Sequence, residues 1–231
     1  MSTDTMDLVV YKNNRLHRIK FVSYSIIKRV LGFVFALIGI IVASPVMILT
    51  AIAIKLDSKG PAIFKQIRTG YKGKTFYVYK FRSMAVDNDV HDFSSQDRHT
   101  KVGNFIRKTS IDELPQLFNV LLGQMAFIGP RPWITDYWDN MNERERHRCD
   151  VLPGITGLAQ AKGRNAITIF DKINYDLEYV ENYSLWQDIK VIFWTIKTVL
   201  SKQGADAGKS TIQNELHDLI VENGEQAEVI A

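Results

Sequence analysis

A hydrophobic stretch dominates the N-terminal part of the sequence: residues 30–54 are 25 positions without a charged side chain. As one continuous helix this stretch would be about 37 Å long, which is enough to cross a bilayer. Basic residues flank it on both sides, whereas a single span is oriented by an asymmetry of positive charge. One arrangement that suits both flanks places both ends on the cytoplasmic face, with a turn inside the membrane. The flanking residues are Arg15, Arg18, Lys20, Lys28 and Arg29 before the stretch and Lys55, Lys59, Lys65 and Arg68 after it.

Ser44 and Pro45 lie inside this stretch and mark a place for the turn. Proline has no N–H, and its ring clashes with the carbonyl four residues earlier, which here belongs to Ile41. The Ser44 hydroxyl is able to bond a carbonyl freed in this way, and such bonds make helix breaks tolerable in lipid. The pattern therefore predicts two helical limbs, 30–44 and 45–54, in a re-entrant hairpin, and it leaves a kinked continuous span as the alternative.

A second apolar pattern lies at residues 185–200, where hydrophobic side chains recur near helical spacing. Lys190 and Lys197 are seven positions apart and share one face, while Trp186 and Trp194 suit the headgroup boundary of a membrane. This pattern predicts an amphipathic helix at the membrane interface with snorkelling lysines. An ordinary helix that turns its apolar face to a protein core fits the same spacing.

The remaining sequence predicts a small α/β globule. Gly70 and Gly73 mark a turn between strand-like segments 63–67 and 75–81, and the polar residues 85–104 indicate a loop. The pattern predicts further helices at 114–122, 136–150 and 166–183. It also predicts a linker at 203–211 and a short helix at 212–222. The predicted fold class is a membrane-associated α/β protein: a re-entrant helix-break-helix hairpin under a compact globule, with amphipathic interfacial helices and a short β-hairpin.

Composition and charge narrow the class of protein. The chain has 231 residues and a mass of 26.4 kDa, enough for one substantial domain. Cys149 is the single cysteine, which excludes a disulfide scaffold and a multi-cysteine metal site. Residues 201–231 contain two lysines and six acidic residues, so this tail carries −4 and residues 1–200 carry +8 of the net charge of +4. A basic body indicates an anionic partner such as phosphate, nucleic acid or lipid headgroups, or else a solvated basic surface.

Candidate chemistry is densest at residues 107–117. Ser110 and Glu113 have the spacing of a capping box, and Pro115 places the start of the regular helix near itself. Asp112 and Glu113 then lie at a helix N-terminus, where both are expected to be ionised at pH 7. Adjacent carboxylates can hold Mg²⁺, and an ionised aspartate can act as a nucleophile. Helix capping with solvated charges explains the same pair without catalysis.

Cations elsewhere suit the binding of phosphate. Arg131 stands between Pro130 and Pro132, which stiffen the backbone around its guanidinium. By contrast, the charged run 143–148 is interpreted as a solvated helix face. Further candidates are Lys80 and Arg82 on one strand, Arg107 before the acidic pair, and Arg164 with the neighbouring Gly163 and Asn165.

At these residues the sequence resembles the bacterial sugar transferases, and among them the small monotopic phosphoglycosyl transferases that move a phospho-sugar onto a polyprenyl phosphate. The resemblance extends from about residue 24 to 201. The sequence departs from the residues usual in this family at three positions, Ser83, Leu158 and Lys162. The resemblance rests on Ser44-Pro45, KFRSM (80–84), SIDELPQLFNVL (110–121), IGPRP (128–132), PGITGLAQ (153–160) and GRN (163–165).

The resemblance implies a location and a set of partners. Both ends of the membrane hairpin would lie on the cytosolic face of the bacterial inner membrane, as in a monotopic protein. The expected partners are a UDP-sugar, undecaprenyl phosphate, inner-membrane lipid and other enzymes of a glycan pathway, with no nucleic acid. The expected division is a basic N-terminal segment (1–29), the hairpin (30–54), a catalytic domain (55–201) and an acidic tail (202–231).

The resemblance also implies a reaction. Asp112 attacks the donor β-phosphate and UMP leaves, after which undecaprenyl phosphate attacks the phosphosugar–aspartate intermediate, as the first membrane step of a surface glycan or glycoprotein pathway. Mg²⁺ is the expected cofactor, held at Asp112 and Glu113. We assign Arg107 and Arg131 to the donor phosphates, Lys80, Arg82 and Arg164 to the donor or lipid phosphate, and Pro130, Pro132, Gly163 and Asn165 to a donor loop.

Two other classes of function remain open from the residues. A hydrolase of isoprenoid diphosphates or nucleotide sugars would use the same carboxylates and cations, with water as the acceptor. A membrane-anchored basic module would bind nucleic acid or acidic lipid without any reaction, and substitution of Asp112 would then be harmless to binding.

Overall fold

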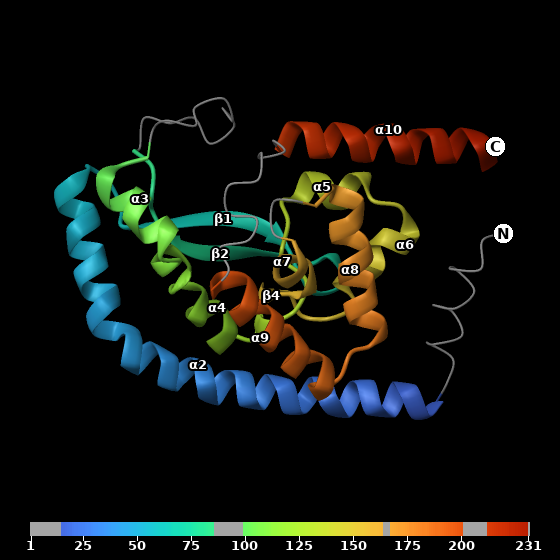
Figure 1. Cartoon of the computed structure of the whole chain (residues 1–231), viewed down its shortest axis with the longest axis horizontal. Coiled ribbons are helices and arrows are strands. Elements are labelled where there is room, and N and C mark those ends of the chain that lie inside the picture. Colours follow the sequence, from blue (N-terminus) through green and yellow to red (C-terminus); the bar gives the residue numbers. More distant parts are fainter. Residues whose placement is uncertain (1–14, 86–98, 164–166, 201–211, 231) are drawn as a thin grey trace.

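The longest element of the computed structural model is α2 (Arg15–Asp57), a helix of 43 residues. The structure describes residues 15–85, 99–163, 167–200 and 212–230. Helix α2 curves along one side of the molecule, and the strands and shorter helices lie on its concave side (Figure 1). The segment Phe21–Asp57 is long and apolar enough to cross a membrane, and only 17% of its most apolar window is buried.

The helix continues through Ser44 and Pro45, where the sequence predicted a break. Limbs 30–44 and 45–54 are two parts of one curved helix that passes through Pro45, so the chain does not fold back on itself there (Figure 1). The Ser44 hydroxyl donates a 2.7 Å hydrogen bond to the carbonyl of Ile41, the group that Pro45 leaves without its usual N–H partner. Because this local bond satisfies the freed carbonyl, the helix continues past the proline.

The middle and C-terminal parts of α2 lie against the globule. A Cβ added to Gly39 would be 3.5 Å from Leu117 of α4 (Gln116–Leu121), so the two backbones approach closely. Further along, Ile54 is buried against Phe81 and Ile106. Small residues such as Gly39 and the large Ile54 therefore form the contact surface of α2 for the domain, while many other large apolar side chains of α2 are exposed.

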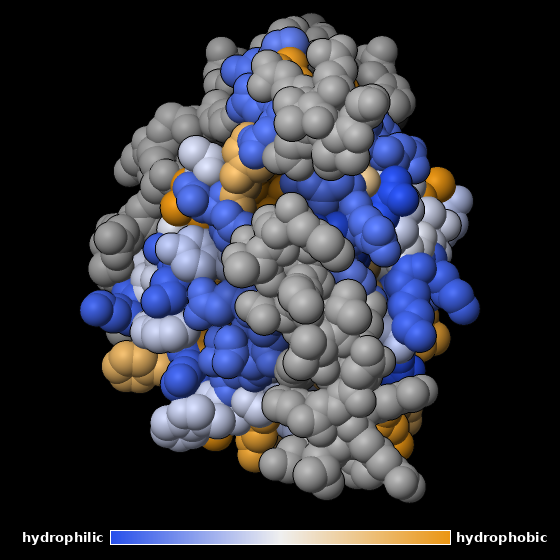
Figure 2. Space-filling model, turned by 90° about the vertical axis from the view of Figure 1, so that its right-hand side faces the viewer, coloured by the Kyte–Doolittle hydropathy of each residue, from blue (hydrophilic) through white to orange (hydrophobic). Residues whose placement is uncertain are grey.

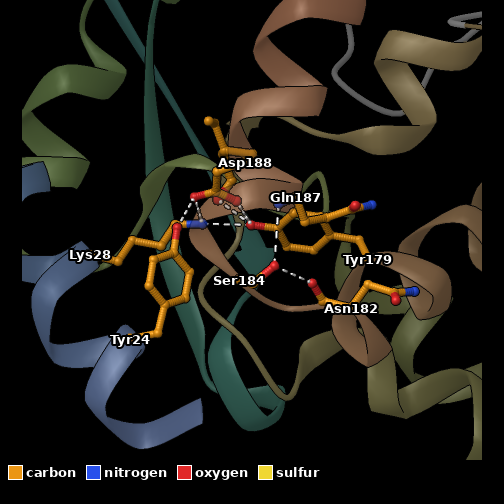
Figure 3. A network of polar contacts seen from close by, with 8 residues as sticks. Tyr24, Lys28, Tyr179, Asn182, Ser184, Gln187 and Asp188 are labelled. Carbon is orange, nitrogen blue, oxygen red and sulfur yellow. Dashed lines mark hydrogen bonds and ion pairs between the residues drawn. The ribbon is translucent and has the colours of Figure 1, made fainter. Parts of the chain in front are cut away.

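The N-terminal part of α2 is attached by a buried polar network (Figure 3). Lys28 Nζ lies 2.6 Å from Asp188 Oδ2 and 2.5 Å from the hydroxyl of Tyr179. The Tyr24 hydroxyl donates to Asp188 at 2.6 Å, and that of Tyr179 donates to the other carboxylate oxygen at 2.5 Å. Tyr179 belongs to α8 (Ile169–Glu181) and Asp188 to α9 (Leu185–Leu200), so one network joins three helices.

The predicted β-hairpin is confirmed. Strands β1 (Ile63–Thr69) and β2 (Thr75–Phe81) are antiparallel, and η1 (Tyr71–Gly73) makes the turn between them. The buried Asn119 of α4 follows β2 closely, because its amide donates to the carbonyl of Tyr77 at 2.7 Å and accepts from the N–H of Tyr79 at 3.1 Å. Helix α4 thus takes the place of a third strand along this edge.

A second, parallel pair of strands consists of β3 (Ala126–Ile128) and β4 (Gly154–Thr156). The loop after β3 passes so close to β4 that a Cβ on Gly154 would be 2.1 Å from the backbone nitrogen of Gly129. Any side chain at Gly154 would therefore displace this loop. Helices α7 (Leu158–Lys162), α8 and α9 pack against β3. Helix α5 (Thr135–Asn140) packs against α8 in a second cluster, and α6 (Glu143–Arg146) and η3 (His147–Cys149) follow it in the chain.

Two segments differ from the sequence prediction. Residues 101–104 of the predicted loop 85–104 belong instead to α3 (Lys101–Lys108), which begins with the Thr100 side chain accepting a hydrogen bond from the Gly103 N–H, and residues 86–98 of that loop lie outside the described residues. The short helix predicted for 212–222 is the longer α10 (Ile212–Ile230), whose fully buried Leu219 packs with Tyr137. The predicted linker 203–211 lies outside the described residues.

Apolar side chains gather on the side of α2 and α9. In α9, Val191 is fully buried, but Trp186 is 64% and Phe193 66% exposed, and in α2 Val42 is 73% exposed. The outward face of α9 is therefore the apolar one, which favours the predicted interfacial helix over a core helix. The face shown in Figure 2 is hydrophilic over most of its coloured surface, with hydrophobic side chains toward its edges.

Candidate active site

Two basic side chains meet one carboxylate of the acidic pair. Glu113 Oε1 lies 2.8 Å from Lys80 Nζ and 2.7 Å from Arg131 Nη2. Lys80 comes from β2, Arg131 from the loop after β3, and Glu113 from η2 (Ile111–Glu113). Burial alone would raise the pKa of Glu113, but the charges and hydrogen bonds of Arg131 and Lys80 outweigh it and lower the pKa to about 2. Glu113 is therefore a fixed anion that organises two cations.

The predicted capping box at Ser110 is wrong. Ser110 has the left-handed backbone conformation, with φ of 57°, and its side chain makes no capping hydrogen bond. The Glu113 carboxylate turns to Lys80 and Arg131 instead, because two cations hold it more strongly than one backbone N–H. As predicted, the regular helix starts near Pro115, which is the residue before α4. The left-handed turn at Ser110 places Asp112 and Glu113 in a single turn of 3₁₀ helix.

Asp112 is half-buried next to this cluster. Burial raises the pKa of its carboxyl above the ordinary value, and the negative charge of Glu113 acts in the same direction. The charges of Lys80, Arg107 and Arg131 oppose the rise. In the described part of the chain, Glu113 forms both ion pairs and Asp112 forms none. The carboxylate of Asp112 is thus the more basic of the two and the one left available to react.

The Arg131 loop is held in place by a buried ion pair that the sequence analysis missed. Arg148 Nη2 lies 2.6 Å from Asp176 Oδ2, and both side chains are at most 2% exposed. The same guanidinium donates to the backbone carbonyl of Arg131 at 2.8 Å and stacks 3.8 Å from the ring centre of Trp133. Arg148 was interpreted as part of a solvated helix face, because nothing local distinguishes it from its exposed neighbours.

The other candidate residues divide into two groups. Arg107 is exposed, lies 2.6 Å from His99 and acts on Asp112 by its charge. Arg82 is buried and donates to the carbonyls of Ser58 and Lys59, just after α2 ends, so it binds the backbone rather than the acidic pair. Pro130 and Pro132 flank Arg131 as expected, and Gly163 ends α7, whereas Arg164 and Asn165 lie outside the described residues.

A further cation, Arg68, lies near Arg131. Burial, followed by the charge of Arg131, lowers the pKa of Arg68 to about 10. Its hydrogen-bond partner is the side chain of Gln66, at 2.5 Å. Side chains alternate along β1, so Arg68 lies on the same face as Phe64, which pairs with Lys80. This alternation is a signal that the sequence contains. Arg68 was counted only as a basic flank of the hydrophobic stretch.

The two carboxylates allow a Mg²⁺ ion but do not form a complete protein cage. Over the residues that the structure describes, no group of three or more His, Cys, Asp and Glu side chains is placed to hold a metal ion. Mg²⁺ is usually held by one or two carboxylates together with substrate phosphates and water. Asp112 and Glu113 are two carboxylates of the kind that such a site uses, so the donor set is chemically compatible with Mg²⁺.

Comparison with known proteins links this arrangement to a family. The family model described as "Bacterial sugar transferase" matches residues 23–202. The chain is 45% identical over 207 residues to the galactosyl transferase CpsE of Streptococcus agalactiae, covering 82% of this chain and 46% of that protein.

Two further relatives carry names that state a reaction. Identity is 44% over 192 residues with the UDP-N-acetylgalactosamine-undecaprenyl-phosphate N-acetylgalactosaminephosphotransferase of Aeromonas hydrophila, covering 79% of this chain and 45% of that protein. The identity with the UDP-glucose:undecaprenyl-phosphate glucose-1-phosphate transferase of Klebsiella pneumoniae is 43% over 187 residues, covering 74% of this chain and 39% of that protein. The chain thus spans less than half the length of these three relatives.

Proposed function

The chain belongs to the bacterial sugar transferase family, and we propose that it transfers a sugar 1-phosphate from a UDP-sugar to undecaprenyl phosphate, with release of UMP. The observation that carries the proposal is the available Asp112 carboxylate beside a Glu113 that holds two cations. The names of two relatives state this class of donor and this acceptor. The product would be undecaprenyl-diphosphate-sugar, for the first membrane step of a bacterial surface glycan or glycoprotein pathway.

The reaction proceeds in two displacements at one phosphorus atom. An oxygen of Asp112 forms a bond to the donor β-phosphorus, and the bond from that phosphorus to the bridging oxygen breaks, so UMP leaves with the electron pair. A phosphate oxygen of undecaprenyl phosphate then attacks the same phosphorus. This second step breaks the bond to Asp112, restores its carboxylate and forms the diphosphate link of the product.

The cations act on the charge that both displacements move. Arg131 and Lys80, held by Glu113, are placed to neutralise donor phosphate oxygens, and Arg107 does so from the exposed side. The rigid 130–132 loop keeps the Arg131 guanidinium in position before the substrate arrives. A Mg²⁺ held by Asp112, Glu113 and the donor diphosphate would supply further neutralisation of the diphosphate.

We also propose that the protein is monotopic on the cytosolic face of the inner membrane. Both ends of α2 support this, because Lys28 is paired with Asp188 and Ile54 is buried against Phe81 of the same globule. A helix whose two ends contact one domain leaves both ends on the side of that domain. The exposed apolar faces of α2 and α9 would enter the lipid, and the site would then lie close to the membrane surface, where we expect the phosphate of the acceptor.

The test measures UMP release by the full chain in detergent or nanodiscs. The donors are UDP-galactose, UDP-glucose and UDP-N-acetylgalactosamine, the sugars of the relatives' names, each with Mg²⁺ and with or without undecaprenyl phosphate. We expect sustained release that requires the lipid and identifies the sugar. Asp112→Asn should abolish it, whereas Asp139→Asn, the same change at an exposed position of α5, should not.

Other outcomes would overturn the proposal in distinct ways. Sustained UMP release without undecaprenyl phosphate would identify a hydrolase that uses water as the acceptor. Equal activity of Asp112→Asn and the unaltered chain would remove Asp112 as the nucleophile. Release from none of the donors, together with unchanged lipid binding by Asp112→Asn, would favour the membrane-anchored binding module.

A further inference from the structure

We propose that Arg68 is a donor-binding residue that contacts the α-phosphate of the UDP-sugar, the phosphate that leaves as UMP. The geometry that carries this inference is a row of three cations, Lys80, Arg131 and Arg68, along one face of the β-hairpin. The inference rests on the function proposed above and adds a direction to it: the donor would lie along the hairpin, with its nucleotide end away from Asp112.

The register of the hairpin places Arg68 and Lys80 on the same face. Paired residues of an antiparallel sheet share a face, and Lys80 pairs with Phe64 while Arg68 pairs with Phe76. Phe64, Gln66 and Arg68 alternate along β1 and therefore point to the same side. Arg68 and Lys80 are four residues apart along the strands, which corresponds to about 13 Å.

Arg131 is near both of these cations. It shares the Glu113 carboxylate with Lys80, and its charge also acts on Arg68. The loop that carries it is tied to the end of β1, since the N–H of Thr69 donates to the carbonyl of Trp133 at 2.8 Å. This bond holds the residue after Arg68 against the second residue after Arg131, so the two arginines come from neighbouring backbone segments.

The charges of this row are incompletely balanced by the protein. Glu113 serves Lys80 and Arg131, whereas the side-chain contact of Arg68 within the described part of the chain is with the neutral Gln66. Like charges held close together at half-buried positions are unfavourable, and an anion between them removes that cost. A phosphate group suits two guanidinium forks because each fork donates two parallel hydrogen bonds.

The row therefore orders the donor. The β-phosphate must reach Asp112 for the first displacement, which places it at the Lys80 and Glu113 end. The α-phosphate, one bridging oxygen further, then lies toward Arg131 and Arg68. When the bridging bond breaks, negative charge accumulates on the leaving UMP, and Arg68 would stabilise that charge together with Arg131.

The experiment compares the binding of UMP and uridine to the full chain in detergent, by calorimetry. The two ligands differ only in the phosphate, so their affinity ratio isolates the phosphate contact. Arg68→Gln should reduce the preference for UMP by about tenfold to a hundredfold, as expected for loss of a charged hydrogen bond, and leave uridine affinity unchanged. Arg144→Gln is the matched control, because Arg144 is also partly buried and contacts the neutral Asn174 instead.

A conservative variant keeps the inference testable if Arg68→Gln does not fold. Arg68→Lys keeps the charge but loses the fork, and we expect a UMP preference between those of Arg68→Gln and the unaltered chain. Both variants are first checked by their unfolding temperature. If Arg68→Gln does not fold, the ratio measured with Arg68→Lys decides, and an unaltered ratio in that variant overturns the inference.

The outcomes separate this inference from the proposed function. Equal weakening of UMP and uridine by Arg68→Gln, or no weakening of either, would overturn the α-phosphate contact while lipid-dependent UMP release still stood. Loss of UMP preference in a chain that releases no UMP from any UDP-sugar would overturn the transferase and keep a nucleotide-phosphate site at Arg68.

Discussion

Arg131 and Glu113, which are 18 residues apart in the sequence, form an ion pair with 2.7 Å between Nη2 and Oε1. The pair joins the loop after β3 to the turn that carries Asp112. Because Lys80 binds the same carboxylate oxygen, one anion aligns two cations beside the proposed nucleophile. The arrangement separates the acidic pair into Glu113, which organises the two cations, and Asp112, the proposed nucleophile.

The first prediction concerns acid stability. The pKa of Glu113 is lowered in the folded chain to about 2 from an ordinary 4.5, so its ionised form stabilises the fold at pH values above 4.5. This contribution, on the order of 3 kcal/mol, is lost as the pH falls through about 2. Glu113→Gln should therefore be less stable than the unaltered chain at pH 7, with a difference that shrinks between pH 4.5 and 2. Denaturant unfolding at several pH values measures it, and an equal difference at pH 7 and 2.5 would contradict the ion pair.

The second prediction concerns the pH dependence of the reaction. The first displacement needs ionised Asp112, whose pKa is raised mainly by burial, so single-turnover UMP release should decline at a pH above the ordinary 3.8 of an aspartate. Arg107 lowers this pKa by its charge. Arg107→Gln should therefore move the acid limb of the rate profile to higher pH, in addition to weakening donor binding. An unchanged limb would show that Arg107 does not act on Asp112.

The third prediction concerns the support of the Arg131 loop. Asp176→Asn leaves the buried Arg148 without its counter-ion, which should cost about 3 kcal/mol of stability. Because Arg148 also holds the carbonyl of Arg131, the KM for the donor should rise more than kcat falls. Glu178→Gln, an exposed change on the same helix, is the control. Loss of stability with an unchanged KM would show that the loop keeps its position without this ion pair.

The fourth prediction concerns the attachment of α2. Lys28→Met removes the cation from a buried network and leaves Asp188 with only tyrosine partners, so it should destabilise the fold by about 3 kcal/mol. Hydrogen exchange should accelerate in residues 21–30 and in the first turn of α9. Arg29→Met provides the comparison, since Arg29 is exposed and one position away. If both variants exchange alike, the network does not hold the helix to the domain.

Local patterns predicted the elements that depend on neighbouring residues. The β-hairpin was predictable because alternating side chains and the glycines of its turn are adjacent in the chain. The helical start near Pro115 and the apolar character of 185–200 follow from the same kind of signal. The predicted break at Pro45 was wrong, but the predicted bond from the Ser44 hydroxyl to a freed carbonyl is present. Because this bond satisfies the Ile41 carbonyl, the helix continues past the proline.

Partners of charged side chains were not predictable in this way. Arg82 and Arg131 both looked suited to phosphate, yet Arg82 binds the backbone after α2 and Arg131 joins Glu113. Arg148 looked solvated and is buried against Asp176, 28 residues away. An ion pair between distant residues leaves no periodic trace, because each charge is locally indistinguishable from a surface charge.

The sequence by itself determined the family, the apolar character of 30–54 and 185–200, and the acidic pair that carries the proposed chemistry. These properties reside in residue types and spacings over a few turns or strand positions. Only the tertiary structure decided which carboxylate is paired, which cations share it, which face of α9 is exposed and that α2 remains one helix. Those outcomes depend on burial and on contacts between distant segments, and both exist only once the chain has folded.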